Sequence, residues 1–215
     1  RSIGYDIRTD QAVHIVGAYL QNEWKTRKWS LLIGGRLDKH NLVDHAIFSP
    51  RANVRFNPSE SVNLRVSYAG GYRAPQAFVG GKRVRIRLAD DLKEERSHSV
   101  SLSADLYHTF GRVQTNLLVE GFYTRLDDVF ALRDIEDTAD GGKIKERYNG
   151  SGATVRGLNA EGRAVFTRWF ELQAGVTWQR SRYVEPEYWS EDKTVPPVRR
   201  MFRTPDAYGY FTASF

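Results

Sequence analysis

Apolar and polar residues alternate one by one over much of this chain. In the segment Trp29–Asp38, Leu31 and Ile33 fall on one face, whereas Ser30 and Arg36 fall on the other. A two-residue period is what a β-strand with one apolar and one polar face requires. The alternation therefore predicts an all-β protein rather than a helical one.

The same period predicts about nine strands. Six have a regular register, namely Trp29–Asp38, Phe48–Phe56, Val62–Arg73, Ser97–Thr109, Val113–Thr124 and Trp169–Ser181. Three have a less regular one, namely Ala12–Trp24, Gly152–Phe166 and Pro205–Phe215.

The connections between these runs are short and long in turn. The short ones are Thr26–Lys28, Asn57–Glu60, Phe110–Arg112 and Thr167–Arg168. The long ones are Asp38–His45, Arg73–Arg96, Leu126–Tyr148 and Val184–Phe202. An antiparallel meander with all tight turns on one side and long loops on the other is typical of an outer-membrane β-barrel.

Charges and aromatic residues favour the same interpretation. Full charges such as Arg65 and Glu120 lie on the polar faces, as a hydrated lumen would require. Aromatic residues cluster at the short connections, as in an interfacial girdle; they are Trp24, Trp29, Phe56, Phe110, Trp169 and Phe170. A soluble β-sandwich would instead place the polar face in water and the apolar face in a core, and this alternative stays open here.

Composition excludes several classes. The 215 residues contain no cysteine, which excludes disulfide frameworks, zinc–thiolate sites and thiol catalysis. No run of 18 apolar residues occurs, so a transmembrane helix is not expected, whereas a barrel strand needs only about 9–11 residues. The net charge of +6 suits either a nucleic acid or an anionic lipopolysaccharide leaflet.

An odd number of strands near nine conflicts with a closed bacterial barrel, which normally has an even number. An open sheet edge in hydrocarbon would leave backbone groups unsatisfied. The segment Arg1–Asp10 also lacks the apolar stretch of a secretory signal. We therefore expect this chain to be one part of a longer protein.

Several segments, in order, resemble TonB-dependent outer-membrane receptors. Phe48–Phe56 begins with the "SPR" of that family, and Asn63–Tyr68 leads into Gly71-Tyr72-Arg73-Ala74-Pro75. Further similar segments are Tyr19–Trp24, Leu92–Ser97 and Val155–Glu161. The resemblance spans essentially the whole chain, and the sequences of these segments are most similar to receptors of Bacteroides-type bacteria.

The resemblance implies an antiparallel meander that forms part of a 22-stranded transmembrane barrel. Residues 1–215 would be a fragment of the barrel domain from its C-terminal half, without the plug domain. Its partners would be the plug and the other barrel strands, the TonB complex through that plug, and outer-membrane lipid and lipopolysaccharide. Phe215 resembles a terminal aromatic signal, but in this family further strands usually follow a segment such as Phe202–Asp206, so truncation is the favoured interpretation.

The implied function is TonB-energised uptake of a scarce nutrient through the Gram-negative outer membrane: a siderophore, haem, vitamin, metal or glycan. A passive porin-like barrel and a soluble β-rich binding module are the alternatives. Ligand contacts are expected in the long loops and upper lumen, at Arg73, Gln76, Phe78, Tyr188 and Trp189. Structural roles are also open, since Arg73 could pair with lumen or plug carboxylates and Tyr188 could pack within its loop.

Catalytic chemistry is not expected, because no nucleophile–base pair or metal motif occurs, and no cofactor is predicted. His40 and His45 share one loop that is expected to be solvated rather than metal-binding. The acidic segment from Asp134 to Asp140 lacks the spacing of a calcium loop, so a solvated acidic loop is expected there. The basic run Lys82–Arg87 lacks the stacking aromatics of a nucleic-acid strand, so contact with lipopolysaccharide phosphates or an ordinary basic loop hairpin is preferred, and no nucleic acid is expected.

Overall fold

The computed structural model describes residues 2–4, 7–9, 12–75, 84–137, 143–188 and 194–215. Within these ranges the chain consists of β-strands and their connections. The described residues include no helix long and apolar enough to cross a membrane. The prediction of an all-β fold is therefore confirmed.

One large antiparallel sheet contains all nine predicted strands and a short tenth, β14 (Val198–Arg200). The nine are β3 (Ile15–Lys25), β4 (Trp29–His40), β5 (Ala46–Ser59), β6 (Val62–Arg73), β8 (Glu95–Phe110), β9 (Val113–Asp127), β12 (Ala153–Thr167), β13 (Phe170–Glu187) and β15 (Ala207–Ser214). Among these nine strands, each pairs with the next one in the list from β3 to β13. Strands β14 and β15 both pair with β13, at different points along it.

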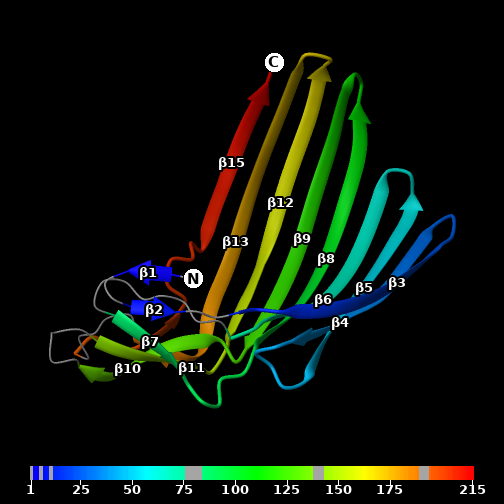
Figure 1. Ribbon diagram of the computed structural model, residues 1–215. Helices are drawn as coiled ribbons and strands as arrows, with labels where there is room; N and C mark the ends of the chain where they lie inside the picture. The colour runs from blue at the N-terminus through cyan, green and yellow to red at the C-terminus, as the bar shows by residue number, and fades with distance from the viewer. Residues whose placement is uncertain (1, 5–6, 10–11, 76–83, 138–142, 189–193) are drawn as a thin grey trace.

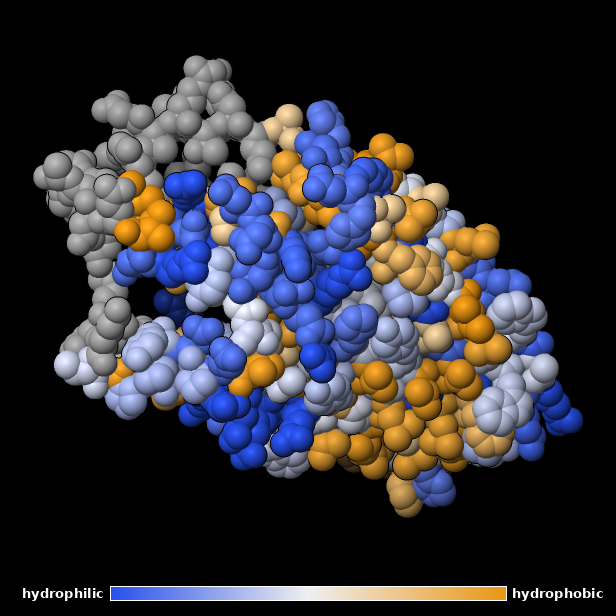
Figure 2. All heavy atoms as spheres, turned by 90° about the horizontal axis from the view of Figure 1, so that it is seen from below, coloured by the Kyte–Doolittle hydropathy of each residue, from blue (hydrophilic) through white to orange (hydrophobic). Residues whose placement is uncertain are grey.

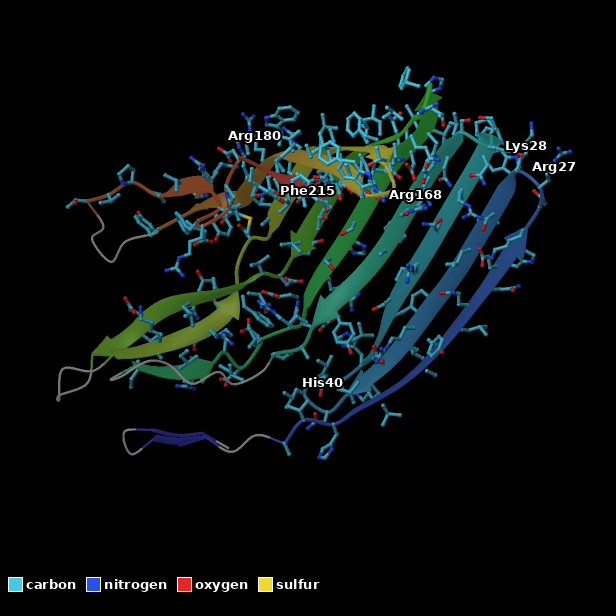
Figure 3. The ribbon with its side chains drawn as sticks, turned by 90° about the horizontal axis from the view of Figure 1, so that it is seen from above. Arg27, Lys28, His40, Arg168, Arg180 and Phe215 are labelled. Atoms are coloured by element: carbon cyan, nitrogen blue, oxygen red, sulfur yellow. The ribbon has the colours of Figure 1, made fainter. Side chains whose placement is uncertain are left out.

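The large sheet curves like part of a cylinder wall (Figures 1 and 3). The short turns β3–β4, β5–β6, β8–β9 and β12–β13 all lie at one end, at the top of Figure 1. The long connections lie at the opposite end, called the loop end below. The sorting of connections by length is confirmed, whereas β3 and β15 leave the cylinder open.

The convex face of the sheet is apolar. One row of cross-strand partners crosses it from β3 to β15 and consists of Trp24, Leu31, Val54, Val66, Leu102, Gly121, Leu158, Trp178 and Ala207. Leu102 is 60% exposed and Trp178 is 57% exposed, and no second layer formed by the described residues covers them. Figure 2 shows the orange side chains gathered along the lower and right-hand margin. A water-soluble domain would bury such a face, so this one is suited to hydrocarbon.

The neighbouring residues on the same strands form a polar concave face. Asn159 donates through Nδ2 to Glu120 Oε1 at 3.1 Å and accepts at Oδ1 from Thr177 Oγ1 at 2.9 Å. Further along the same concave face, between β5 and β6, Asn53 Nδ2 donates to Ser67 Oγ at 2.7 Å. This alternation of apolar and hydrogen-bonded faces is that of a barrel with a hydrated or plugged interior.

Aromatic rings gather at the short turns, as predicted. Trp29 stacks on Phe56 with centroids 4.2 Å apart, and Phe170 stacks on Phe215 at 5.8 Å. Trp169 is 70% exposed. Half-exposed rings at one level of a transmembrane sheet form an interfacial girdle.

Some elements were not anticipated from the sequence. Short strands β1 (Ser2–Gly4) and β2 (Ile7–Thr9) pair near the N-terminus. A three-stranded sheet, in the order β10–β11–β7, lies within the predicted long connections. It contains β10 (Phe130–Asp137), β11 (Lys143–Asn149) and β7 (Val84–Leu88). Because β7 runs parallel to β11, the alternative of a basic hairpin is wrong for Val84–Leu88, whereas contact with lipopolysaccharide stays a prediction.

The predicted turn Asn57–Glu60 is shorter than expected. Strand β5 continues to Ser59, with an irregularity in its pairing with β6 between Phe56 and Ser59. Pro58 has no N–H to donate to a ladder, so a bulge is the way in which a strand accommodates it.

Candidate functional site

The loop end of the sheet carries the three-stranded sheet described above (Figure 1). Opposite charges on its strands fix the pairing of β10 with β11. Arg133 forms an ion pair with its cross-strand partner Glu146, and Lys145 Nζ lies 3.2 Å from Oδ1 of its partner Asp134. Such facing charges favour one register over its neighbours. The predicted acidic loop is thus partly a paired strand.

Arg73 anchors this small sheet to the barrel wall. Its Nε lies 2.5 Å from Oε2 of Glu95, and its Nη2 donates to Oε1 at 2.6 Å. Glu95, with a side chain only 14% exposed, also accepts from the backbone N–H of Phe130, where β10 begins. The guanidinium of Arg73 lies 5.0 Å from the centroid of the Phe130 ring. Two-point carboxylate pairing with a cation–π contact makes this a rigid polar cluster.

Asn149 joins two further connections of the same region through side-chain hydrogen bonds. Its Oδ1 accepts from the N–H of Lys93 at 2.8 Å, and its Nδ2 donates to the carbonyls of Lys93 at 3.0 Å and Asp128 at 2.8 Å. Asp128 has φ of 56°, a left-handed conformation that short polar residues tolerate. The connection before β8 and the corner between β9 and β10 are therefore held together.

Positive charge is concentrated around Phe130. The Arg147 guanidinium lies 5.9 Å from the ring centroid, on which Arg73 also packs. Burial and the nearby charge of Arg73 lower the pKa of Arg147, while Glu95 opposes the shift. Two guanidinium groups thus pack near one aromatic ring, and Arg73 is already paired with Glu95.

A small cavity of about 180 Å³ lies beside this cluster, and Tyr188 lines it. Phe130, Tyr183, Glu187 and Phe202 also line it. Burial and the neighbouring Glu185 carboxylate raise the pKa of Glu187. Burial and the Glu187 charge raise the pKa of Tyr183 as well. The cavity thus offers aromatic walls and one carboxyl group that holds its proton more tightly than usual.

A hydrogen-bonded contact centred on Glu94, called the latch below, joins the β4–β5 connection to the segment before β8. Glu94 Oε1 lies 3.0 Å from His45 Nε2 and accepts from Arg96 at 2.7 Å. Burial would raise the pKa of Glu94, but the bonds from Arg96, its own backbone and His45 outweigh that effect, so the pKa is lowered. This carboxylate therefore stays charged and holds the two connections together.

His40 corrects one prediction. It was expected in a solvated loop, yet it is fully buried, and its Nδ1 accepts from the N–H of Leu42 at 3.0 Å. Its Nε2 has no hydrogen-bond partner among the described residues. In the described ranges, no three His, Asp or Glu side chains gather in a way that could hold a metal ion.

Of the five predicted ligand-binding residues, the structure describes two. Arg73 and Tyr188 lie at the loop end, in the cluster and the cavity above. Gln76, Phe78 and Trp189 lie outside the described residues. Sequence reasoning did not select Glu95, although it belongs to the segment Leu92–Ser97 that carries part of the family resemblance. It also missed Phe130, because nothing local marks an aromatic residue that two distant arginines contact.

Solved structures similar to this one include a siderophore receptor, an iron transporter, a copper transporter and an outer-membrane receptor for alcaligin. The siderophore receptor PirA from Pseudomonas aeruginosa superposes with a TM-score of 0.67 at 18% identity, covering 80% of this chain and 35% of that one. The FrpB iron transporter from Neisseria meningitidis superposes with a TM-score of 0.63 at 20% identity, covering 80% of this chain and 26% of that one. The alcaligin outer-membrane receptor FauA from Bordetella pertussis superposes with a TM-score of 0.59 at 17% identity, covering 93% of this chain and 33% of that one. The chain thus spans about a third or less of the length of these proteins.

Searching curated protein sequences found no match. The family model described as "TonB dependent receptor-like, beta-barrel" matches residues 2–215. That match confirms the family resemblance, while the expected similarity to Bacteroides-type receptors stays a prediction. Together with the curved antiparallel sheet and its apolar convex face, it shows that this chain belongs to the β-barrel of the TonB-dependent receptors of the Gram-negative outer membrane.

Proposed function

We propose that the protein of which this chain is part binds a scarce nutrient outside the cell and imports it with energy supplied through TonB. The loop end would receive the ligand, and the polar concave face would surround the plug domain. The partners would be that plug, the remaining barrel strands and the TonB complex. The barrel wall described here would hold the binding surface in place rather than carry out chemistry.

The family match over residues 2–215 is the observation that carries this proposal. The Arg73–Glu95–Phe130 cluster supports the proposal, because it brings a guanidinium group and an aromatic ring together at the loop end. Two of the solved structures named above are a siderophore receptor and an iron transporter. A chelated metal is therefore the first ligand class to test.

Growth of a strain from which the complete receptor gene has been deleted provides the test. With iron supplied only as a panel of ferric siderophores or haem, or with cobalamin limiting, the deletion should abolish growth on one nutrient. Restoring the intact gene should restore growth, and a second deletion in tonB should abolish it again. Uptake that survives the loss of TonB would instead identify a passive porin-like barrel and overturn the proposal.

A further inference from the structure

The convex face changes character abruptly near the loop end of β12 and β13. Leu158 and its partner Trp178 belong to the apolar row. Two residues further toward the loop end on each strand, the same face carries Arg156 and its partner Arg180. Arg182, two residues beyond Arg180 on the same face of β13, extends the change. Figure 3 shows Arg180 on the convex side of the sheet. Three guanidinium groups thus follow directly on the lipid-facing band.

These arginines are not neutralised within the structure. Arg156, Arg180 and Arg182 are exposed, and no carboxylate of the described residues forms an ion pair with any of them. By contrast, Arg163 on the concave face of the same strand β12 forms two hydrogen bonds of 2.6 Å with Glu171. Unpaired cations at this level need an external counter-charge.

A shallow hollow of about 690 Å³ lies between these charges and the apolar row. Leu158 and Trp178 line its apolar part, and Arg156 and Arg180 line its cationic part. Gly121 also lines it, and because glycine has no side chain, the surface beside Leu158 stays open. Asp206 at the rim is already paired with Arg200 at 2.9 Å. The hollow therefore combines apolar walls with positive charge on one side.

Tyr123 is the cross-strand partner of Arg156 and lines the same hollow. Tyrosine and tryptophan favour the membrane interface, where the ring is desolvated and the polar atom stays wet. Tyr123 and Trp178, 44% and 57% exposed, thus mark the level of the headgroups at the loop end. The arginines stand at or just above that level.

We propose that this hollow binds a phosphorylated glycolipid of the outer leaflet, namely the lipid A part of lipopolysaccharide. Arg156 and Arg180, with Arg182 beside them, pair with its phosphates, while acyl chains or sugar pack on Leu158 and Trp178. Guanidinium groups bind phosphate through two parallel hydrogen bonds, and a basic pocket beside a transmembrane wall is a common way to hold an anionic headgroup. This site lies outside the lumen and is separate from the nutrient-binding surface proposed above.

The test uses the full-length receptor purified in detergent, with diphosphorylated lipid A as the probe. We expect Arg156→Gln together with Arg180→Gln to weaken lipid A binding by about tenfold or more, since each cation near a lipid surface contributes roughly fivefold. Quenching of Trp178 fluorescence by a lipid A analogue brominated in its acyl chains should fall in parallel. The matched control Arg163→Gln changes an arginine on the same strand but on the concave face, and should leave binding unchanged.

Two further probes identify the ligand. Lipid A from which both phosphates have been removed should bind the unmodified receptor weakly, and inorganic phosphate should not displace intact lipid A. Unchanged affinity in the double variant, or equal weakening in Arg163→Gln, would overturn the proposal. Equal binding of phosphatidylglycerol would also overturn it, because the site would then be a general anionic-lipid surface. Retention of the heat-modifiable gel shift of folded barrels confirms that each variant has folded.

Discussion

Gly157 on β12 lies directly against the backbone carbonyl of Trp178 on β13. A Cβ atom added to Gly157 would stand 2.3 Å from that oxygen and 2.8 Å from the ring of Phe122. The neighbouring strand can approach only because Gly157 has no side chain. This explains physically why a glycine stands within Val155–Glu161, one of the segments that resemble the receptor family.

Replacing Gly157 with alanine should therefore disrupt the pairing of β12 with β13. The new methyl group would meet main-chain atoms, which cannot move aside as a flexible side chain can, and overpacking of this kind costs about 1–3 kcal/mol. Gly162→Ala on the same strand is the control, because nothing lies within 4 Å of its added Cβ. Urea unfolding of the full-length receptor in detergent should show a loss for Gly157→Ala and no loss for Gly162→Ala. Equal stability of the two variants would contradict the close approach.

The two faces of the sheet should respond differently to charge. Leu102→Arg places a cation on the convex face midway along β8 and should destabilise the barrel by about 2–4 kcal/mol in a bilayer. Ser101→Arg, on the adjacent residue and the opposite face, should cost much less, because its charge meets the polar interior. Folding titrations into lipid vesicles measure both. If Ser101→Arg were the more damaging variant, the assignment of the faces would be wrong.

The Arg73–Glu95 pair should control the order of β10. Glu95→Ala removes the acceptor of the Phe130 N–H as well as the partner of Arg73. Loss of an acceptor from a partly buried donor costs about 1–3 kcal/mol, so amide exchange at the start of β10 should accelerate. Hydrogen-exchange mass spectrometry of the β10 peptide provides the measurement. Glu60→Ala, in a short turn at the other end of the sheet, is the control and should leave that peptide unchanged.

The latch at Glu94 should open in acid. Its pKa is lowered from the ordinary value of 4.5, so folding favours the charged form. The stabilisation is complete above pH 4.5 and disappears as the pH falls through the lowered pKa. Exchange of the β4–β5 connection, which contains His45, should therefore rise steeply below pH 4.5 in the unmodified protein. In Glu94→Gln the latch is weakened at every pH, and this step should vanish; a step of the same size in the variant would exclude Glu94 as its origin.

The transmembrane part could be predicted from sequence because its signal is local. Alternation over Trp29–Asp38 or Ser97–Thr109 reports the two faces of each strand, and the structure confirms all nine predicted strands. The loop end could not be predicted, since its order depends on contacts between distant residues. Lys93 and Asn149 are 56 positions apart, and β7 pairs with β11 across the whole of β8, β9 and β10. Among the candidate ligand residues, Arg73 could be named from the sequence and its role as a ligand contact stays a prediction. Its pairing with Glu95 could not be named, because it depends on the register of β6 against β8.

Every residue of β3 is exposed, and β3 pairs only with β4 among the described strands. In hydrocarbon, each backbone group left without a hydrogen bond costs several kcal/mol. A free-standing sheet of this kind would therefore be unstable in a bilayer, and closure into a barrel would supply the hydrogen-bond partners that β3 lacks among the described strands. A substitution that disrupts pairing at the edge strand β3 or β15 should therefore destabilise the whole barrel, including strands that do not contact that edge.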